Sequence, residues 1–258
     1  MKTLKNKLVL AIVLLCGLTL SAQNVIFPIA SQYNGVESNK YDLENWNSNQ
    51  DYYSQLLAIA NTNGTKVLGD KFLYPEFFNG TIINYQNSTK AKADLRYNIY
   101  SDVFEISLNS ANDQFKKLKK DKNYQFILNE EKFVLIQNSL LDGNSQDGDY
   151  GYVVELYNSQ SKTSLFKKYK LKFKIGSEGE SQYHPHNDSE IIDFVDYFIK
   201  IDDRYQKVEL NKNKIARLFD DHKAEIVDFI DHRKFNFRGA NNKIENQLLQ
   251  VVRYYSSL

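Results

Sequence analysis

Residues 80–108 read GTIINYQNSTKAKADLRYNIYSDVFEISL and contain three segments with the pattern of β-strands. In the middle segment, residues 91–99, Ala, Ala, Leu, Tyr and Ile at the odd positions alternate with Lys92, Asp94, Arg96 and Asn98. Such period-two alternation is typical of an antiparallel strand with one buried face. Polar turns at 86–89 and 100–102 separate this segment from apolar residues on both sides. We therefore predict a three-stranded β-meander, which is not a catalytic motif.

Further strand patterns lie on both sides of the meander. Residues 67–68 predict a short strand before it, and residues 124–128 and 132–136 predict a hairpin after it. Strands are also expected at 152–157 and 164–175, with a last hairpin at about 195–210. Lysines at 168, 170, 172 and 174 would share one side of their strand, which predicts a protected sheet edge. The polar run 109–122 is interpreted as a solvated connection.

The C-terminal part has the apolar periodicity of helices. Apolar side chains recur every three or four residues from Ile215 to Ile230, with a break near Asp220-Asp221, and residues 241–258 predict a further helix. The expected fold class is α+β: an antiparallel β-rich body at 65–210, built as a meander, roll or barrel-like sheet, followed by two or three helices at 211–258. We expect the body and the helices to form one domain. Residues 23–64 are expected to form a lead-in with a short helix at 52–60.

The first 22 residues have the organisation of a cleaved signal peptide. Three lysines precede an apolar segment of 13 residues, Leu8 to Leu20, and Ser21-Ala22-Gln23 supplies a cleavage site with small residues. The apolar segment is shorter than the roughly 20 residues that span a bilayer. Cys16 follows Leu15 and is itself followed by apolar residues, which disfavours lipidation. The sequence therefore predicts export to the periplasm, the outer-membrane periphery or the medium.

Composition excludes several classes of function for the mature chain. The only Cys and the only Met lie in the signal segment, so the mature chain has no disulfide and no thiolate nucleophile. Removing three lysines changes the formal charge from +1 to −2, which disfavours nucleic acid as a partner. After the signal no apolar run approaches the length of a transmembrane segment. The 18 Tyr and 16 Phe residues favour a β-rich architecture.

Two polar loops are candidates for metal ions. His184 and His186, near Glu180 and Asp188, lie in a loop without a second ligand pair at defined spacing. The loop that begins at Asp142 departs from the EF-hand pattern at its fifth, sixth and twelfth positions. We interpret both segments as ordinary solvated loops and expect no metal and no cofactor.

No catalytic motif is present. Ser145 lies in Gly143-Asn-Ser-Gln-Asp147, which lacks the second glycine of a nucleophile elbow, and no glycine-rich phosphate loop precedes a helix. A pair of catalytic carboxylates leaves no local signature, and Glu105 and Asp94 are candidates only because they lie on the predicted sheet. His222 is expected to pack on the apolar side of its helix. We therefore assign no catalytic residue from the sequence.

Three segments of the sequence resemble those of a known group of proteins: the signal ending in SAQ, the segment around Leu95-Arg96-Tyr97-Asn98, and the C-terminal YYSSL. They are similar to a group of exported proteins of Bacteroidota with a "GTV…LRYN.Y.D.F" strand pair and a helical tail that ends in a "YYN.L"-like sequence. Ser stands here where Asn often occurs. The resemblance implies an exported location and this architecture, and it supplies no catalytic residues because no activity is established for the group.

The expected function is that of a non-enzymatic binding or envelope-associated protein, with an envelope protein or a glycan as partner. One alternative is a secreted hydrolase that acts on glycan or peptide through carboxylates. Another is a subunit of an envelope assembly that docks through its helical tail. An open aromatic groove would favour the binding protein, and a cleft with convergent acids would favour the hydrolase.

Overall fold

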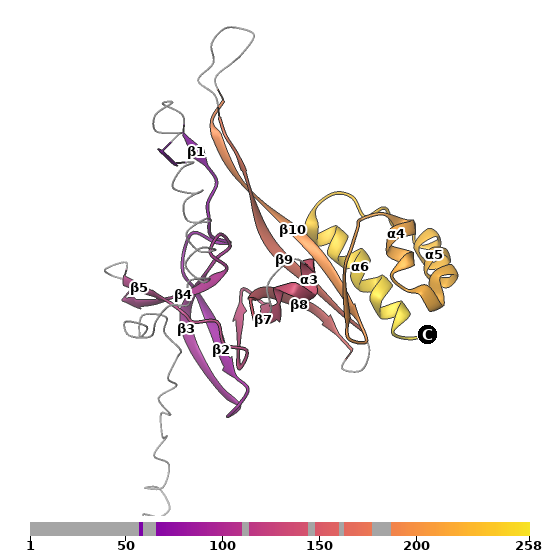
Figure 1. The fold of residues 1–258 in the computed structure, drawn as a ribbon, viewed down its shortest axis with the longest axis horizontal. Helices are drawn as coiled ribbons and strands as arrows, with labels where there is room; N and C mark the ends of the chain where they lie inside the picture. The colour runs from indigo at the N-terminus through magenta and orange to yellow at the C-terminus, as the bar shows by residue number, and fades with distance from the viewer. Residues whose placement is uncertain (1–56, 59–65, 110–113, 144–147, 160–162, 177–186) are drawn as a thin grey trace, which may run out of the picture.

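The computed structural model describes residues 57–58, 66–109, 114–143, 148–159, 163–176 and 187–258 (Figure 1). The strands are β1 (Val67–Leu68), β2 (Phe78–Asn84), β3 (Thr89–Asn98), β4 (Val103–Asn109), β5 (Gln114–Lys117), β6 (Tyr124–Leu128), β7 (Glu131–Gln137), β8 (Tyr150–Asn158), β9 (Thr163–Lys174), β10 (Ser189–Ile201) and β11 (Arg204–Lys207). The helices are α3 (Asn138–Asp142), α4 (Lys212–Arg217), the short 3-10 helix η2 (Asp220–His222), α5 (Lys223–His232) and α6 (Asn241–Tyr255). This is the predicted α+β fold with a β-rich body and C-terminal helices.

The strands form one sheet in the order β1-β10-β9-β8-β7-β6-β2-β3-β4-β5, with β11 paired to β10. Among the described strands, β1 is the one that pairs in parallel, and the other pairings are antiparallel. The predicted meander is present as β2, β3 and β4, and Leu95 and Tyr97 of β3 are buried as the alternation requires. The signal segment lies outside the described residues, as does most of the expected helix at 52–60.

The sheet curls around an aromatic core. Neighbouring strands lie about 4.8 Å apart, so β4 and β8 would be about 24 Å apart across a flat sheet in this order. The rings of Phe104 on β4 and Tyr152 on β8 are nevertheless only 5.1 Å apart. Phe104 also packs at 4.3 Å on Phe126 and at 5.1 Å on Phe133. The body is therefore a partly closed roll whose concave face is filled by aromatic rings.

Asp102, in the turn before β4, joins the two sides of this roll. Its carboxylate accepts a hydrogen bond of 2.7 Å from the Tyr97 hydroxyl and one of 3.1 Å from the backbone N–H of Tyr152 on β8. Lys120 donates to the same carboxylate at 2.9 Å and to the carbonyl of Tyr150 at 2.7 Å. Burial, followed by the charge of Asp102, raises the pKa of Tyr97 well above its ordinary value, so its hydroxyl stays protonated and donates.

The C-terminal helices cover one face of β9 and β10 (Figure 1). Their apolar stripes are buried against the sheet in a second core, which contains Ile215, Phe219, Ile226, Ile230, Leu248, Val251 and Val252 from the helices and Leu165, Tyr197 and Ile199 from the strands. Lys167 of β9, 7% exposed, binds both Glu131 at 2.6 Å and Glu245 of α6 at 3.1 Å. Burial opposes its charge, but the two carboxylates outweigh burial and raise the pKa of Lys167.

Several local predictions need correction. The sequence predicts a connection over 109–122, but residues 114–117 form β5, which pairs with β4 as the last strand of the sheet order. The short helix α3 was not predicted, and the last hairpin begins at residue 189 rather than 195. The edge prediction for β9 is wrong for residues 163–167, which lie between β8 and β10. It holds for residues 168–174, which pair only with β10 among the described strands.

Candidate functional site

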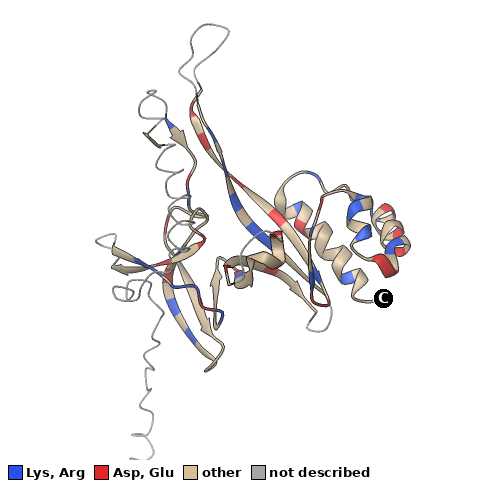
Figure 2. Ribbon diagram, viewed as in Figure 1, with Lys and Arg blue, Asp and Glu red and all other residues tan. Residues whose placement is uncertain are grey.

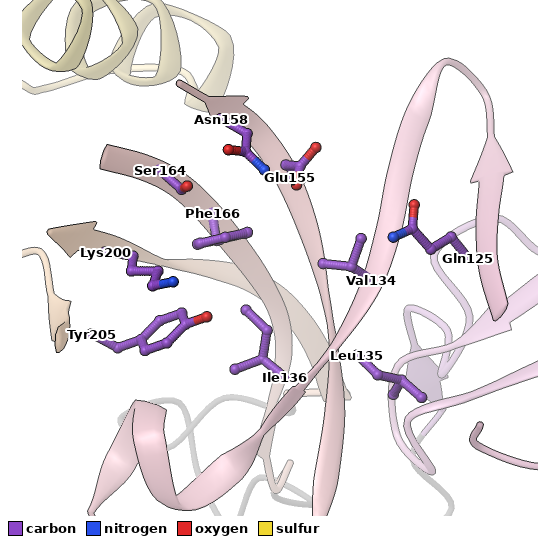
Figure 3. Close-up of a pocket in the computed structure, with 10 residues that line it drawn as sticks. All are labelled: Gln125, Val134, Leu135, Ile136, Glu155, Asn158, Ser164, Phe166, Lys200 and Tyr205. Atoms are coloured by element: carbon purple, nitrogen blue, oxygen red, sulfur yellow. Dashed lines mark hydrogen bonds between the residues drawn. The ribbon is translucent and has the colours of Figure 1, made fainter. Parts of the chain in front are cut away.

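The candidate site is an open groove on the sheet (Figure 3). Its residues Phe166 and Lys200 alternate along their strands with Leu165 and Ile199, which pack on the C-terminal helices, so the groove lies on the other face. Its volume is about 510 Å³. Six strands, β6 to β11, contribute the lining residues Gln125, Val134, Leu135, Ile136, Glu155, Asn158, Ser164, Phe166, Lys200 and Tyr205. We call this feature the sheet groove.

The floor of the sheet groove is apolar and carries an aromatic pair. Val134, Ile136 and Phe166 are buried in a third core cluster, against which Tyr205 packs. The rings of Phe166 and Tyr205 lie 5.9 Å apart and are tilted by 33°. Tyr205 is only half-buried, so part of its ring faces the groove (Figure 3). Because Val134, Ile136 and Phe166 are almost fully buried, the exposed part of the Tyr205 ring is the main apolar surface that the groove offers to a ligand.

Glu155 is the acid of the sheet groove, and it is already engaged. One carboxylate oxygen accepts a hydrogen bond of 2.8 Å from Lys132, and the other accepts one of 3.0 Å from the side-chain amide of Asn158. Burial opposes the charge of Lys132, but the hydrogen bond and the negative charge of Glu155 outweigh it and raise the pKa of Lys132. The Lys132 ammonium therefore stays charged at neutral pH, and both oxygens of Glu155 are occupied by hydrogen bonds from neighbouring side chains.

Lys200 and Tyr205 supply donors at the other end of the groove. The Lys200 ammonium lies 5.7 Å from the centre of the Tyr205 ring and 3.2 Å from a carboxylate oxygen of Asp203. Burial raises the pKa of Tyr205, so its hydroxyl is a donor at neutral pH. Together with the amides of Gln125 and Asn158, these groups surround an apolar floor with hydrogen-bonding partners. That combination suits binding of a polar ligand with one apolar face.

The two carboxylates considered from sequence, Glu105 and Asp94, do not lie in the groove lining. Glu105 is 2% exposed and accepts a hydrogen bond of 2.7 Å from Arg96. The Arg96 guanidinium lies 3.7 Å from the ring centre of Phe72 and also donates to the carbonyl of Pro75. Asp94 is exposed, and its carboxylate accepts a long hydrogen bond of 3.5 Å from the Asn79 side-chain amide. Glu105 is therefore a buried carboxylate paired with a partly buried Arg96, and it does not face the groove.

The LRYN segment has a structural explanation in these contacts. Leu95 is buried in the aromatic core, Arg96 pairs with Glu105, Tyr97 donates to Asp102, and Asn98 accepts from the backbone N–H of Ser101. Each polar side chain of the segment thus holds the turn between β3 and β4 or the strands beside it.

Most residues considered for metal binding lie outside the described part of the chain. These are Glu180, His184 and His186 and the centre of the 142–151 loop. Asp188 is described, and its carboxylate accepts from the backbone N–H of Lys66 at 2.9 Å. Within the described ranges no group of three or more His, Cys, Asp or Glu side chains could hold a metal ion. His222 lies in η2 beside Tyr255 of α6, not at the helix–sheet interface as expected.

No family model, curated protein or solved structure matches this chain. The resemblance to exported Bacteroidota proteins therefore stays a prediction. Across the described ranges, no helix combines the length and apolar character needed to cross a bilayer.

Sequence reasoning did not find the sheet groove. Its residues come from six strands with no shared local spacing, and most have the alternation of any half-buried strand. The only available signal was the aromatic content, which is also what core packing requires.

Proposed function

We propose that the protein is an exported, non-enzymatic binding protein that holds a glycan-type ligand in the sheet groove. The observation that supports this best is the partly exposed ring of Tyr205 on Phe166, surrounded by amide and charged side chains on an open strand face. Sugar rings combine an apolar face with many hydroxyl groups. They therefore match an aromatic floor with a polar rim.

The hydrolase alternative has less support. Glycoside hydrolysis uses two acids that flank the bond to be cleaved. Glu155 is the only acid among the described residues that line the groove, and both of its oxygens accept hydrogen bonds from neighbouring side chains. This arrangement favours recognition over proton transfer.

The assembly alternative would need the outer surface of the C-terminal helices. Their apolar stripe is occupied by the sheet, since Leu248, Val251 and Val252 of α6 are fully buried. Docking through the helical tail therefore has no open apolar face of α6 to support it.

The proposal is tested by titrating the mature chain, residues 23–258, with soluble peptidoglycan fragments and neutral oligosaccharides in a calorimeter. We expect saturable binding that Tyr205→Ala weakens about tenfold, because truncation of a central aromatic contact commonly costs more than 1 kcal/mol. Tyr205→Phe keeps the ring and should retain most of the affinity.

Phe78→Ala is the matched control, because Phe78 is an exposed aromatic residue on β2 that does not line the groove. It should leave binding unchanged. The proposal is wrong if none of these glycans binds, or if Tyr205→Ala binds as tightly as the natural chain while remaining folded.

A further inference from the structure

The second half of β9 and the first half of β10 form a ribbon that projects beyond the helices (Figure 1); it is two-stranded except at Ser189 and Glu190, where β1 pairs with β10. The ribbon pairs Lys174 with Glu190, Lys172 with Ile192 and Lys170 with Phe194. Directly opposed residues in an antiparallel pair point to the same side. These three pairs therefore share one face, which we call the ribbon face.

The opposite side of the ribbon is used internally. Tyr169 and Leu171 pack on the aromatic core of the roll, and the Phe173 ring meets Tyr100 at 5.7 Å. The side chains that alternate with them must point away from that core. The ribbon face is consequently directed outward.

The ribbon face combines exposed apolar side chains with positive charge. Ile192 is 42% exposed and Phe194 is 39% exposed. Lys170, Lys172 and Lys174 lie beside them, and Lys207 of β11 reaches Asp196 at 2.8 Å. Two acidic residues partly neutralise these four lysines: Glu190 pairs with Lys174, and Asp196 pairs with Lys170. Figure 2 shows the lysines along β9. The four lysines and two acids leave a local excess of two positive charges, although the chain is negative after signal removal.

We infer that the ribbon face binds the headgroup region of an anionic phospholipid bilayer. Lysines at such a surface are attracted by lipid phosphates, and aliphatic and aromatic side chains enter the boundary between headgroups and acyl chains. A soluble polyanion would satisfy the lysines alone and would leave Ile192 and Phe194 in water. The pairing of each lysine with an exposed apolar neighbour across the ribbon therefore favours a membrane surface over a free anion.

The test measures co-sedimentation of the mature chain with vesicles of phosphatidylglycerol and phosphatidylethanolamine, compared with vesicles of phosphatidylcholine alone. We expect binding to the anionic vesicles only, and weaker binding as salt rises from about 0.05 M to about 0.5 M. The double variant Lys172→Glu/Lys174→Glu should bind at least about 25-fold more weakly, since each lysine near such a surface contributes about fivefold. Phe194→Ala should lose about tenfold at unchanged charge.

Lys90→Glu/Lys92→Glu is the matched control. Both lysines are exposed at alternate positions of β3, so this variant makes the same charge change on another strand. It should keep most of the binding. The inference is overturned if the natural chain ignores anionic vesicles, or if both double variants lose binding equally. It is also overturned if Phe194→Ala has no effect and heparin binds as tightly as vesicles, because the surface would then recognise polyanions in general. None of these results depends on whether the sheet groove binds a glycan.

Discussion

Replacement of Asp102 by alanine should open the roll, because this single carboxylate connects the β3–β4 turn to β8. The change removes the acceptor for the buried Tyr97 hydroxyl at 2.7 Å and for the Tyr152 N–H at 3.1 Å. It also removes the partner of Lys120 at 2.9 Å. In addition, the backbone at residue 102 has a φ of +50°, a conformation that alanine disfavours.

The expected cost follows from these contacts. Each buried donor left without an acceptor costs about 1–3 kcal/mol, and Tyr97 and Tyr152 each lose one. The left-handed backbone adds about 1 kcal/mol for alanine. The ion pair with Lys120 is partly exposed and adds less than about 1 kcal/mol. Asp102→Ala should therefore destabilise the protein by about 3–8 kcal/mol, a large part of the total stability of an ordinary domain.

Three companion variants separate these contributions. Asp102→Asn keeps an acceptor oxygen and tolerates a positive φ, so it should cost only about 1–2 kcal/mol. Asp102→Gly relieves the backbone but restores no acceptor, so it should be about 1 kcal/mol more stable than Asp102→Ala. Asp94→Ala is the control on the exposed face of β3 and should change stability by less than about 0.5 kcal/mol.

Urea unfolding of residues 23–258, followed by circular dichroism, gives these stability differences from the shift of the unfolding midpoint when the slope of free energy against urea is unchanged. An Asp102→Ala variant within about 1 kcal/mol of the natural chain would refute the reasoning, because it would mean that water replaces the carboxylate and that the roll is closed by ring packing alone. Equal costs for alanine and asparagine would also contradict it.

Two further predictions concern buried charges elsewhere in the sheet. Arg96→Met should lower the free energy of unfolding by about 3–5 kcal/mol, because it leaves the buried Glu105 carboxylate without its cation. The double variant Arg96→Met/Glu105→Leu should recover most of that loss. Additive costs in a double-mutant cycle, measured by urea unfolding, would contradict this prediction. For Asp196, burial disfavours the charge, but hydrogen bonds from Lys207 and Lys170 outweigh burial and lower the pKa. Its stabilising contribution is therefore complete above the ordinary aspartate pKa of about 3.9 and is lost as pH falls through the lower pKa of the folded state. The difference in unfolding free energy between the natural chain and Asp196→Asn should thus be constant from about pH 7 to about pH 5 and should vanish in strong acid. A difference that grows on acidification would count against the lowered pKa of Asp196.

The sequence predicted individual elements well where a local period was strong. The meander was predicted from nine alternating residues around Leu95, and α6 from an apolar stripe that includes Leu248 and Val251. The hairpin at 129–131 was also correct, and its turn residues Asn129 and Glu130 both have positive φ, as short hairpin turns require. Predictions failed where the period was weak, as in β5 and α3, which have four and five residues.

By itself, therefore, the sequence determined the fold class, the faces of the longer strands and the helical character of the C-terminal part, because these depend on periodicity within one segment. Only the tertiary structure decided that β2 lies between β6 and β3, that Asp102 meets Tyr152, and that six strands build one groove. The reason is physical. Alternation states which side of a strand is buried, but the choice of neighbouring strands and the curl of the sheet arise from twist and from packing of rings that lie far apart in the chain.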